Sequence, residues 1–239
     1  MEPNDCSPGK LFIIATPIGN LNDFSHRAEN VLIDSDLVAC EDTRVTAKLL
    51  SHYSINKSLV SYREENEKKQ SKILTSEIKK GKNIALVSDA GFPTISDPGF
   101  RLVRECHLQS IEVIPIPGPN AALTALSASG LPTHQFLFLG FLPKKKLGVS
   151  KLLKQWREFE GSIIVYESRY KIERTLGLIL STLGADRFIS IARELTKLHE
   201  SIISGPASQV VEKFYQGSAK GEFTLVIGPA NYSFDYKDE

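Results

Sequence analysis

The sequence is poor in cysteine. Three cysteines, Cys6, Cys40 and Cys106, occur in 239 residues, and no two of them form a C-x-x-C pair. An odd number of widely spaced cysteines argues against a disulfide framework and against a thiolate zinc site. The cysteine content therefore fits a protein of the reducing cytoplasm.

Long apolar runs and histidine patterns typical of metal sites are also missing. The first ten residues, MEPNDCSPGK, contain no apolar stretch of the kind found in signal peptides. The longest early apolar run, residues 11–15, is much too short to cross a bilayer. The five histidines lack the spacing of metal ligands. We therefore expect no export, no membrane insertion and no metal site.

The chain carries almost no net charge. Its 29 lysines and arginines balance 28 aspartates and glutamates, so an RNA partner would have to be held by a local basic patch. The densest basic segment is either the solvated face of a helix or an RNA-facing surface. Its first lysines directly follow a predicted strand, which favours the RNA-facing interpretation. The segment consists of Lys144, Lys145, Lys146, Lys151, Lys154 and Arg157.

In the first half of the chain, short apolar runs alternate with amphipathic stretches. The apolar runs predict strands, and the stretches between them have the spacing of helices. Strands are predicted at residues 11–15, 37–40, 58–62, 83–88 and 110–116, with helices at 25–32, 43–50, 66–79 and after Pro98. This βαβα order predicts a mostly parallel sheet covered on both faces.

The turn Pro117-Gly118-Pro119 marks a domain boundary. We expect residues 1–118 and 119–239 to form two α/β domains. In the second domain, strands are predicted at residues 135–141, 162–167, 187–194, 199–205 and 222–228. Helices are expected between the second and third of these strands and before the last. The second sheet is therefore predicted to be mixed.

Four loops that follow predicted strands have unusual compositions. They are TPIGNLND at 16–23, CEDTR at 40–44, VSDAGFPTISDPG at 87–99 and PGPNAA at 117–122. In open α/β sheets, ligands bind outside the carboxyl ends of the strands, so these loops are the candidate site. The first loop is neither G-x-G-x-x-G nor a P-loop, which argues against a dinucleotide or triphosphate. Asp42 in the second loop is equally well explained as a helix N-cap.

Eight motifs occur in the order and at the spacing of one known family. They are TPIGNL, ACEDTR, VSDAGFPTISDPG, PGPNAALTALSASGLP, FLFLGFLPKK, VYES, ARELTKLHE and GEFTLVI, and the match runs from about Leu11 to Gly228. In these motifs the sequence resembles the ribosomal RNA small subunit methyltransferase I family. That family has the tetrapyrrole methylase-like fold of the class III S-adenosylmethionine-dependent methyltransferases.

The resemblance implies both the reaction and the partners. It implies two α/β domains with a cleft between them for S-adenosylmethionine. It further implies methylation of the ribose 2′-hydroxyl of a cytidine in the decoding region of 16S ribosomal RNA, as free RNA or in the small subunit. A cytoplasmic homodimer without a metal ion is expected.

The resemblance also assigns cofactor contacts. Backbone groups around Asp89, Ala90 and Gly91 would approach the methionine portion, and Ile95 would give an apolar contact. A carboxylate suits a ligand that carries an ammonium and a sulfonium charge. The expected contacts are Pro17, Gly19, Asp89, Ala90, Gly91, Pro93, Ile95, Pro119, Ala121, Phe138 and Gly140.

Removal of a proton from a ribose hydroxyl calls for a general base near the end of a predicted strand. Arg193 and Lys197 could hold a phosphate beside the reacting ribose, or Arg193 could form an ion pair with Glu194 or Glu200. Tyr166 could stack on a base or fill the core. The candidate catalytic residues are Glu41, Asp42, Glu167, Arg193, Glu194 and Lys197, and the candidate RNA contacts are Arg44, Lys144, Lys145, Lys146 and Arg169.

Two other functions compete with rRNA methylation. A methyltransferase acting on a tetrapyrrole or another small molecule is one, but such proteins tend to have a G-x-G-P-G-D first loop, which TPIGNLND does not match. A non-catalytic RNA-binding protein on the same fold is the other, and the acidic residues in the strand-end loops argue against it.

Overall fold

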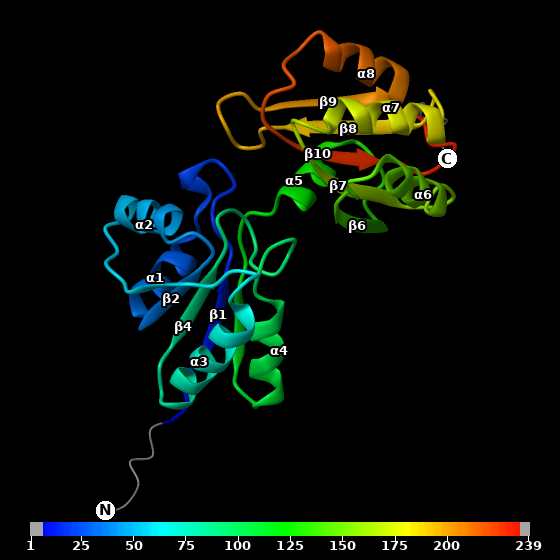
Figure 1. Ribbon diagram of the computed structural model, residues 1–239. Helices are drawn as coiled ribbons and strands as arrows, with labels where there is room; N and C mark the ends of the chain where they lie inside the picture. The colour runs from blue at the N-terminus through cyan, green and yellow to red at the C-terminus, as the bar shows by residue number, and fades with distance from the viewer. Residues whose placement is uncertain (1–6, 235–239) are drawn as a thin grey trace, which may run out of the picture. The chain divides into compact units, whose positions relative to one another are not determined.

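The structure, a computed structural model, describes residues 7–234 and divides the chain into two compact units (Figure 1). Unit 1 extends to Asn120 and unit 2 begins at Ala121. Each unit contains one five-stranded sheet with helices packed on it. The units are described separately below.

The sheet of unit 1, predicted to be mostly parallel, is parallel throughout. Its strands lie in the order β3-β2-β4-β1-β5, and each neighbouring pair is parallel. They are β1 (Leu11–Ile14), β2 (Leu37–Cys40), β3 (Leu59–Ser61), β4 (Ile84–Val87) and β5 (Val113–Ile116). Pro115, which cannot donate a ladder hydrogen bond, lies in the edge strand β5, where a proline is tolerated.

Helices cover both faces of this sheet, because alternate strand residues point to opposite sides. One buried cluster joins Ile13 and Leu86 of the strands to Leu74 and Leu102 of helices α3 (Glu67–Lys79) and α4 (Phe100–Leu108). The other cluster contains neighbouring strand residues and side chains from α1 (His26–Asp34) and α2 (Thr43–His52). A short 3-10 helix, η1 (Leu21–Asp23), precedes α1.

This arrangement predicts where a ligand can enter unit 1. The chain leaves β1 and β2 toward the face of α1 and α2, and it leaves β3 and β4 toward the face of α3 and α4. Strand β4 lies between β2 and β1, so the connections diverge on both sides of β4. Crevices open at such points, beyond the carboxyl ends of the strands.

The sheet of unit 2 is mixed, which confirms the prediction for the second half of the chain. The order is β6-β7-β10-β8-β9, in which β6 and β7 are parallel and the remaining neighbours are antiparallel. The strands are β6 (Phe136–Phe141), β7 (Ser162–Ser168), β8 (Phe188–Arg193), β9 (Ser201–Pro206) and β10 (Glu222–Ile227).

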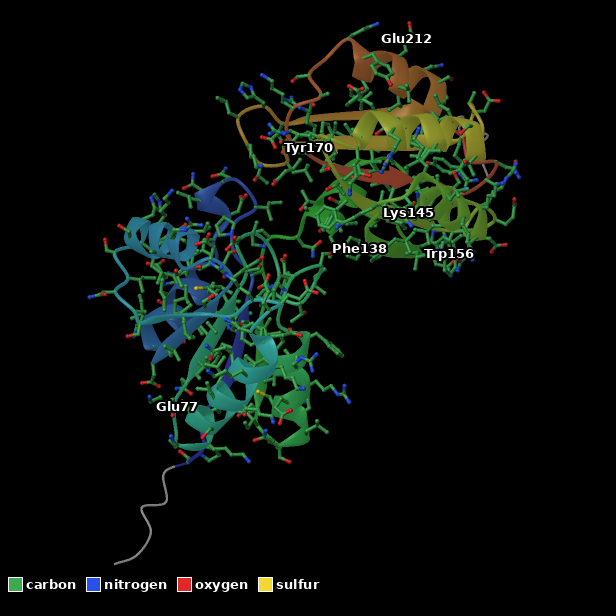
Figure 2. The ribbon with its side chains drawn as sticks, viewed as in Figure 1. Glu77, Phe138, Lys145, Trp156, Tyr170 and Glu212 are labelled. Carbon is green, nitrogen blue, oxygen red and sulfur yellow. The ribbon has the colours of Figure 1, made fainter. Side chains whose placement is uncertain are left out.

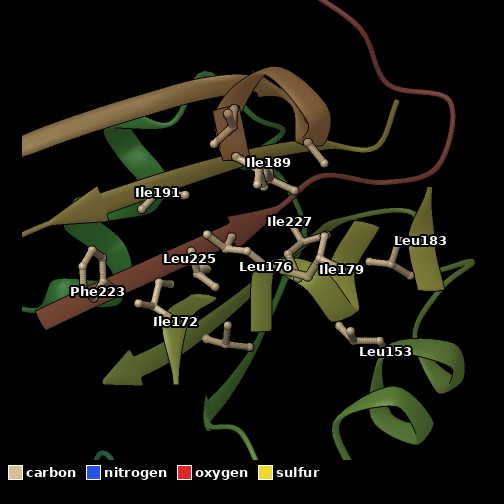
Figure 3. Close-up of a cluster of buried hydrophobic side chains, with 14 of the residues drawn as sticks. Leu153, Ile172, Leu176, Ile179, Leu183, Ile189, Ile191, Phe223, Leu225 and Ile227 are labelled. Atoms are coloured by element: carbon tan, nitrogen blue, oxygen red, sulfur yellow. The ribbon is translucent and has the colours of Figure 1, made fainter. Parts of the chain in front are cut away.

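Three helices pack on one face of this sheet around a large apolar core (Figure 3). They are α6 (Lys146–Gln155), α7 (Ile172–Leu183) and α8 (Ala207–Tyr215). Leu176 and Ile179 of α7 meet Ile189 and Leu225 of the strands in this core. Helix α5 (Ala121–Ala128), rich in small residues, instead contacts β7 and β10, on the other side of the sheet from α7 and α8 in Figure 1.

Two expectations from composition can be compared with the structure. Cys40 and Cys106 are free and buried, and Cys6 lies outside the described residues. Between residues 7 and 234, no helix is long and apolar enough to cross a membrane.

Candidate functional site

A two-way backbone bridge joins the loops that follow β1 and β4. The Thr16 N–H donates to the Gly91 carbonyl at 2.9 Å, and the Gly91 N–H donates to the Thr16 carbonyl at 3.0 Å. The Ser88 hydroxyl also donates to the Gly91 carbonyl at 3.0 Å. Gly91 has a φ of +78°, which glycine adopts without steric cost. Two predicted ligand loops are therefore held together at the carboxyl edge of the sheet.

The geometry around Gly91 fits S-adenosylmethionine. A Cβ at Gly91 would lie 3.5 Å from Ile18 and 3.7 Å from the Pro119 carbonyl, so the loops after β1, β4 and β5 approach one another there. Pro93 is buried, whereas Ile95 is 42% exposed and Asp89 is exposed. Exposed loop backbone, an apolar side chain and a carboxylate suit a ligand with an ammonium group and an apolar part. Pro17, Gly19, Ala90 and Pro119 lie in the same three loops.

A cavity of about 660 Å³ opens beyond the carboxyl ends of β2, β3 and β4. Its size is within the range of small-ligand pockets. The wall is mostly polar and carries both signs of charge. It includes the carboxylates of Glu41, Asp42, Asp89 and Asp97, the arginines Arg44 and Arg63, and Phe100.

Asp42 and Arg44 are paired with each other in this wall. The Asp42 carboxylate accepts the Arg44 backbone N–H at 2.9 Å and caps α2. It also accepts Arg44 Nε at 3.0 Å and Nη2 at 2.6 Å. These bonds hold the pKa of Asp42 well below its usual range. The N-cap interpretation of Asp42 is confirmed, and a carboxylate bonded in this way is a weak proton acceptor.

Glu41 and Asp97 have the opposite electrostatic environment. Burial, together with the negative charge of Asp89, raises the pKa of Glu41. Burial, followed by the charges of Glu41 and Asp89, raises the pKa of Asp97 to about 6. Arg63 Nε donates to the Glu41 carbonyl at 2.9 Å and fixes the backbone of this loop. Of the two carboxyls, Glu41 belongs to the predicted set and has the electrostatics of a proton acceptor.

In unit 2, several predicted residues lie at a single edge of the sheet. Strand β6 is parallel to β7, and β10 is antiparallel to both β7 and β8, so the carboxyl ends of β6, β7 and β8 lie at one edge of the sheet. At this edge, Phe141 pairs with Tyr166, Glu222 pairs with Ser168, and Phe223 pairs with Arg193. The loops that follow these three strands supply the basic segment, Arg169 and the ARELTK segment. The sequence pattern alone does not show that these segments share an edge.

Lys197 bridges two carboxylates at this edge. Its Nζ donates to Glu194 Oε1 at 3.0 Å and to Glu222 Oε2 at 2.8 Å. Although burial disfavours the charge of Lys197, its bonds to Glu222 and Glu194 raise its pKa. Burial likewise works against the Glu194 carboxylate, but the Glu222 N–H and Lys197 outweigh it and lower its pKa. Glu194 is therefore a weak proton acceptor.

Arg193 does not form the ion pair that was considered for it. Its Nε donates to the Lys220 carbonyl at 2.7 Å and its Nη1 to the His199 carbonyl at 3.1 Å. These bonds tie the end of β8 to the loops on either side and orient the guanidinium.

Glu167 is turned into the protein. Its side chain is 2% exposed and accepts the Ser168 N–H and the Thr175 hydroxyl, each at 2.8 Å. Both carboxylate oxygens are therefore bonded within unit 2. This arrangement fixes the start of α7 and gives Glu167 no path to a substrate without rearrangement.

Among the remaining predicted residues of unit 2, Phe138, labelled in Figure 2, and Gly140 lie in β6, and Tyr166 lies in the neighbouring strand β7. Tyr166 stacks edge-on against Phe138 and Phe141, with ring centroids 5.0 and 5.6 Å apart. Gly140 has a φ of +63° at a register shift in β6. Ala121 begins α5.

The basic candidates are exposed to solvent. Lys144, Lys145 and Lys146 form the start of α6 and the residues before it. Arg169 lies over the ring of Tyr170, 4.6 Å from its centroid, and Tyr170 is 80% exposed. These groups are available to a polyanion.

The four candidate loops leave out five residues of the cavity wall: Arg63, Glu64, Glu65, Glu67 and Phe100. The first four follow β3, and Phe100 is the first residue of α4. Asp97 lies in the third candidate loop, although it was not among the predicted site residues. Applying the rule to the loop after β3 would have found Arg63. Phe100 carries no such signal, because an aromatic residue at a helix start is usually part of the core.

Comparison with known proteins identifies the class. The sequence profile described as Tetrapyrrole (Corrin/Porphyrin) Methylases matches residues 10–211, so the chain belongs to that family. Within it, the chain belongs to the ribosomal RNA small subunit methyltransferase I group, as its curated relatives show. The resemblance inferred from the sequence motifs is thereby confirmed.

Three of these relatives carry the name ribosomal RNA small subunit methyltransferase I. The protein of Halalkalibacterium halodurans is 47% identical over 219 residues, which cover 92% of this chain and 75% of the relative. The protein of Escherichia coli O157:H7 is 44% identical over 225 residues, which cover 93% of this chain and 79% of the relative. The protein of Thermotoga maritima is 45% identical over 219 residues, which cover 92% of this chain and 98% of the relative.

Solved structures of low sequence identity share the fold. The methyltransferase CobJ is 16% identical with a TM-score of 0.67, and the match covers 93% of this chain and 95% of CobJ. A second match is a uroporphyrin-III C-methyl transferase from Thermus thermophilus complexed with S-adenosyl homocysteine. It is 15% identical with a TM-score of 0.62, and the match covers 92% of this chain and 97% of that protein. The predicted tetrapyrrole methylase-like fold is confirmed.

Proposed function

We propose that this chain is an S-adenosylmethionine-dependent methyltransferase that modifies the ribose 2′-hydroxyl of a cytidine in the decoding region of 16S ribosomal RNA. The observation that carries the proposal is 44% to 47% identity, over 92% or more of the chain, with relatives named ribosomal RNA small subunit methyltransferase I. The exposed lysines before α6 support an RNA substrate, and the proposal includes a homodimer.

The loops around Gly91 would hold the cofactor. When bound, S-adenosylmethionine supplies an electrophilic methyl group on a sulfonium. The task of the protein is then to orient the 2′-oxygen, to exclude water and to accept the proton. The Thr16–Gly91 bridge holds together the loops that would position the cofactor for this transfer.

Glu41 is the proton acceptor that this function favours. Asp42 and Glu194 have lowered pKa values, and Glu167 is buried with both oxygens bonded. Glu41 is half-buried with a raised pKa, so it takes up a proton more readily than an ordinary carboxylate.

The test is incubation with radiolabelled S-adenosylmethionine and three acceptors: small subunits lacking the modification, free 16S RNA and a tetrapyrrole. We expect label in RNA that survives alkali as a resistant dinucleotide, the property of a 2′-O-methylated ribose. In the Glu41→Gln variant, kcat should fall by about 10²- to 10⁴-fold while cofactor binding is retained.

The alternatives give different results in this experiment. Label in the tetrapyrrole alone would reject the RNA substrate. Cofactor binding without label in any acceptor would indicate a non-catalytic protein.

A further inference from the structure

The cavity of unit 1 lacks an assigned occupant. Its volume of about 660 Å³ exceeds what a water cluster between loops requires and is suited to a small organic group. It borders the loops of the Thr16–Gly91 bridge, since Asp89 is part of its wall, but residues after β2 and β3 make up much of that wall. A ligand there must match an acidic interior that also contains arginines.

Phe100 gives the cavity a flat apolar surface. It is the first residue of α4 and is 69% exposed, although it belongs to an element whose Leu102 and Cys106 are fully buried. An exposed aromatic ring beside a polar cavity offers the kind of surface on which an unstacked nucleobase lies. Leu108, at the other end of α4, is equally exposed at 70% and does not line the cavity.

Asp97 is placed to accept hydrogen bonds inside the cavity. Among the other wall carboxylates, Asp42 binds Arg44, and Asp89 Oδ1 accepts the Asp42 N–H at 3.1 Å. Asp97 has Ser88 as a side-chain hydrogen-bond partner, and an ionised carboxylate has several acceptor positions, so Asp97 can accept further donors. Asp97 is half-buried, so a hydrogen bond to it is partly shielded from water. A carboxylate accepts the exocyclic amine of cytosine and offers no donor to the corresponding carbonyl of uracil.

The arginines of the wall carry the complementary charge. The Arg44 side chain is 83% exposed even though it is paired with Asp42, and Arg63 uses its Nε to hold the Glu41 carbonyl. Guanidinium groups at these positions can contact phosphates flanking a nucleotide, which the carboxylates of the interior would repel.

From these observations we propose that the cavity receives the extruded base of the target cytidine, with Phe100 stacking on the ring and Asp97 accepting the exocyclic amine. The inference rests on the proposed rRNA methyltransferase function and deepens it, because it names the residues that select the base. Sequence-specific recognition of RNA commonly reads bases that are taken out of their stack and lie on aromatic side chains.

The experiment compares small subunits that carry cytidine or uridine at the methylated position. The wild-type protein should prefer cytidine by about tenfold or more in kcat/KM, the discrimination typical of one good base contact. Asp97→Asn should reduce that ratio about tenfold, because its amide can donate to the uracil carbonyl. Phe100→Ala should lower kcat/KM for both substrates by about tenfold and leave the ratio unchanged.

Matched variants outside the cavity control for nonspecific effects. Leu108→Ala removes an equally exposed apolar side chain from α4, and Glu112→Gln neutralises a carboxylate that pairs with Lys10 before β5. Both should retain the wild-type rate and ratio. Calorimetry with S-adenosylmethionine should give the same affinity for all five proteins.

The outcomes separate the inference from the function on which it rests. If the wild-type protein labels neither subunit, the proposed function fails and the inference falls with it. If it labels the cytidine subunit but Asp97→Asn keeps the wild-type ratio, the base is read elsewhere and the inference alone is overturned. Loss of cofactor affinity in Asp97→Asn and Phe100→Ala, with the ratio unchanged, would assign the cavity to the cofactor and also overturn it.

Discussion

At the scale of single residues, the cavity of unit 1 concentrates negative charge in a protein proposed to act on RNA. Burial raises the pKa values of Glu41 and Asp97, the charge of Asp89 adds to the effect on both, and the charge of Glu41 adds to the effect on Asp97. Such an arrangement opposes folding at neutral pH, since buried like charges repel. Its presence at the carboxyl edge of the sheet is consistent with a functional role.

Replacing Asp97 with asparagine should therefore stabilise the protein at neutral pH. The pKa of Asp97 is about 6 when folded, against 3.8 for the free side chain. Since the folded state holds this proton more tightly, the free energy of unfolding of the wild type falls as pH rises from about 4 to about 6. An asparagine side chain does not titrate, so the Asp97→Asn variant should gain on the order of 1 kcal/mol above pH 6, after allowance for solvent screening.

Urea denaturation of both proteins at pH 4 and at pH 8 measures this gain. The advantage of Asp97→Asn should be present at pH 8 and nearly absent at pH 4. An equal difference at both pH values would show that the substitution acts through packing and not through the charge.

At the scale of elements, the loop from β4 to α4 depends on unusual backbone conformations. Thr94 and Ser96 have φ values of +75° and +66°, and Gly99 has a φ of +138°. Such conformations are costly for residues with a Cβ and persist where the surrounding structure holds them. This loop carries Asp97 and borders the cavity, so its shape and the site are linked.

Gly99→Ala should distort this loop. A Cβ at residue 99 would lie 2.8 Å from Thr94 Cγ2 and 2.9 Å from Leu86 Cδ2, at a φ that alanine rarely adopts. We expect a loss of about 1–3 kcal/mol of stability together with reduced methylation, measured by thermal unfolding and by the labelling assay.

Gly177→Ala is the matched control. Gly177 lies in α7, where an added Cβ would meet nothing within 4 Å. Alanine there should stabilise the helix by about 0.5–1 kcal/mol without changing activity. Equal effects of the two substitutions would contradict the importance of the backbone conformation at Gly99.

At the scale of elements, local sequence patterns predict the strands but not the partners of their side chains. Apolar runs located every strand of both sheets because burial produces a local pattern, and the strand-end rule led to Glu41 and Asp89. The pairing of Lys197 with Glu222 joins residues 25 positions apart through antiparallel strands, and no local pattern encodes it. Glu167 occupies a strand end like Glu41, yet a hydroxyl from α7 holds it in the interior. Tertiary partners, which periodicity does not reveal, decide which acids remain available.

At the scale of the whole molecule, a net charge of +1 places a limit on how RNA can be bound. Long-range attraction by the whole protein is weak at this charge, so affinity must arise from local contacts with phosphates. The exposed lysines before α6 lie beside the edge of the unit 2 sheet that also carries Arg169 and Lys197. This position makes them better candidates for phosphate contacts than the lysines of α3, which lie on an ordinary amphipathic helix.

Substituting Lys144, Lys145 and Lys146 with alanine should therefore weaken binding to the small subunit and reduce its salt dependence. Each lost phosphate contact lowers the slope of log K against log salt by about 0.7–0.9, so loss of two or three contacts should be measurable by filter binding between about 50 and 200 mM salt. The backbone carbonyl of Lys144, which accepts Arg174 Nη1 at 3.1 Å, is retained in the variant.

A triple substitution of Lys68, Lys69 and Lys72 on α3 is the matched control, because it removes the same charge from exposed positions. If the two triple variants lose affinity equally, binding reflects total charge and the segment before α6 is not a specific contact; a larger loss for Lys144–Lys146 places the RNA at the strand-end edge of unit 2.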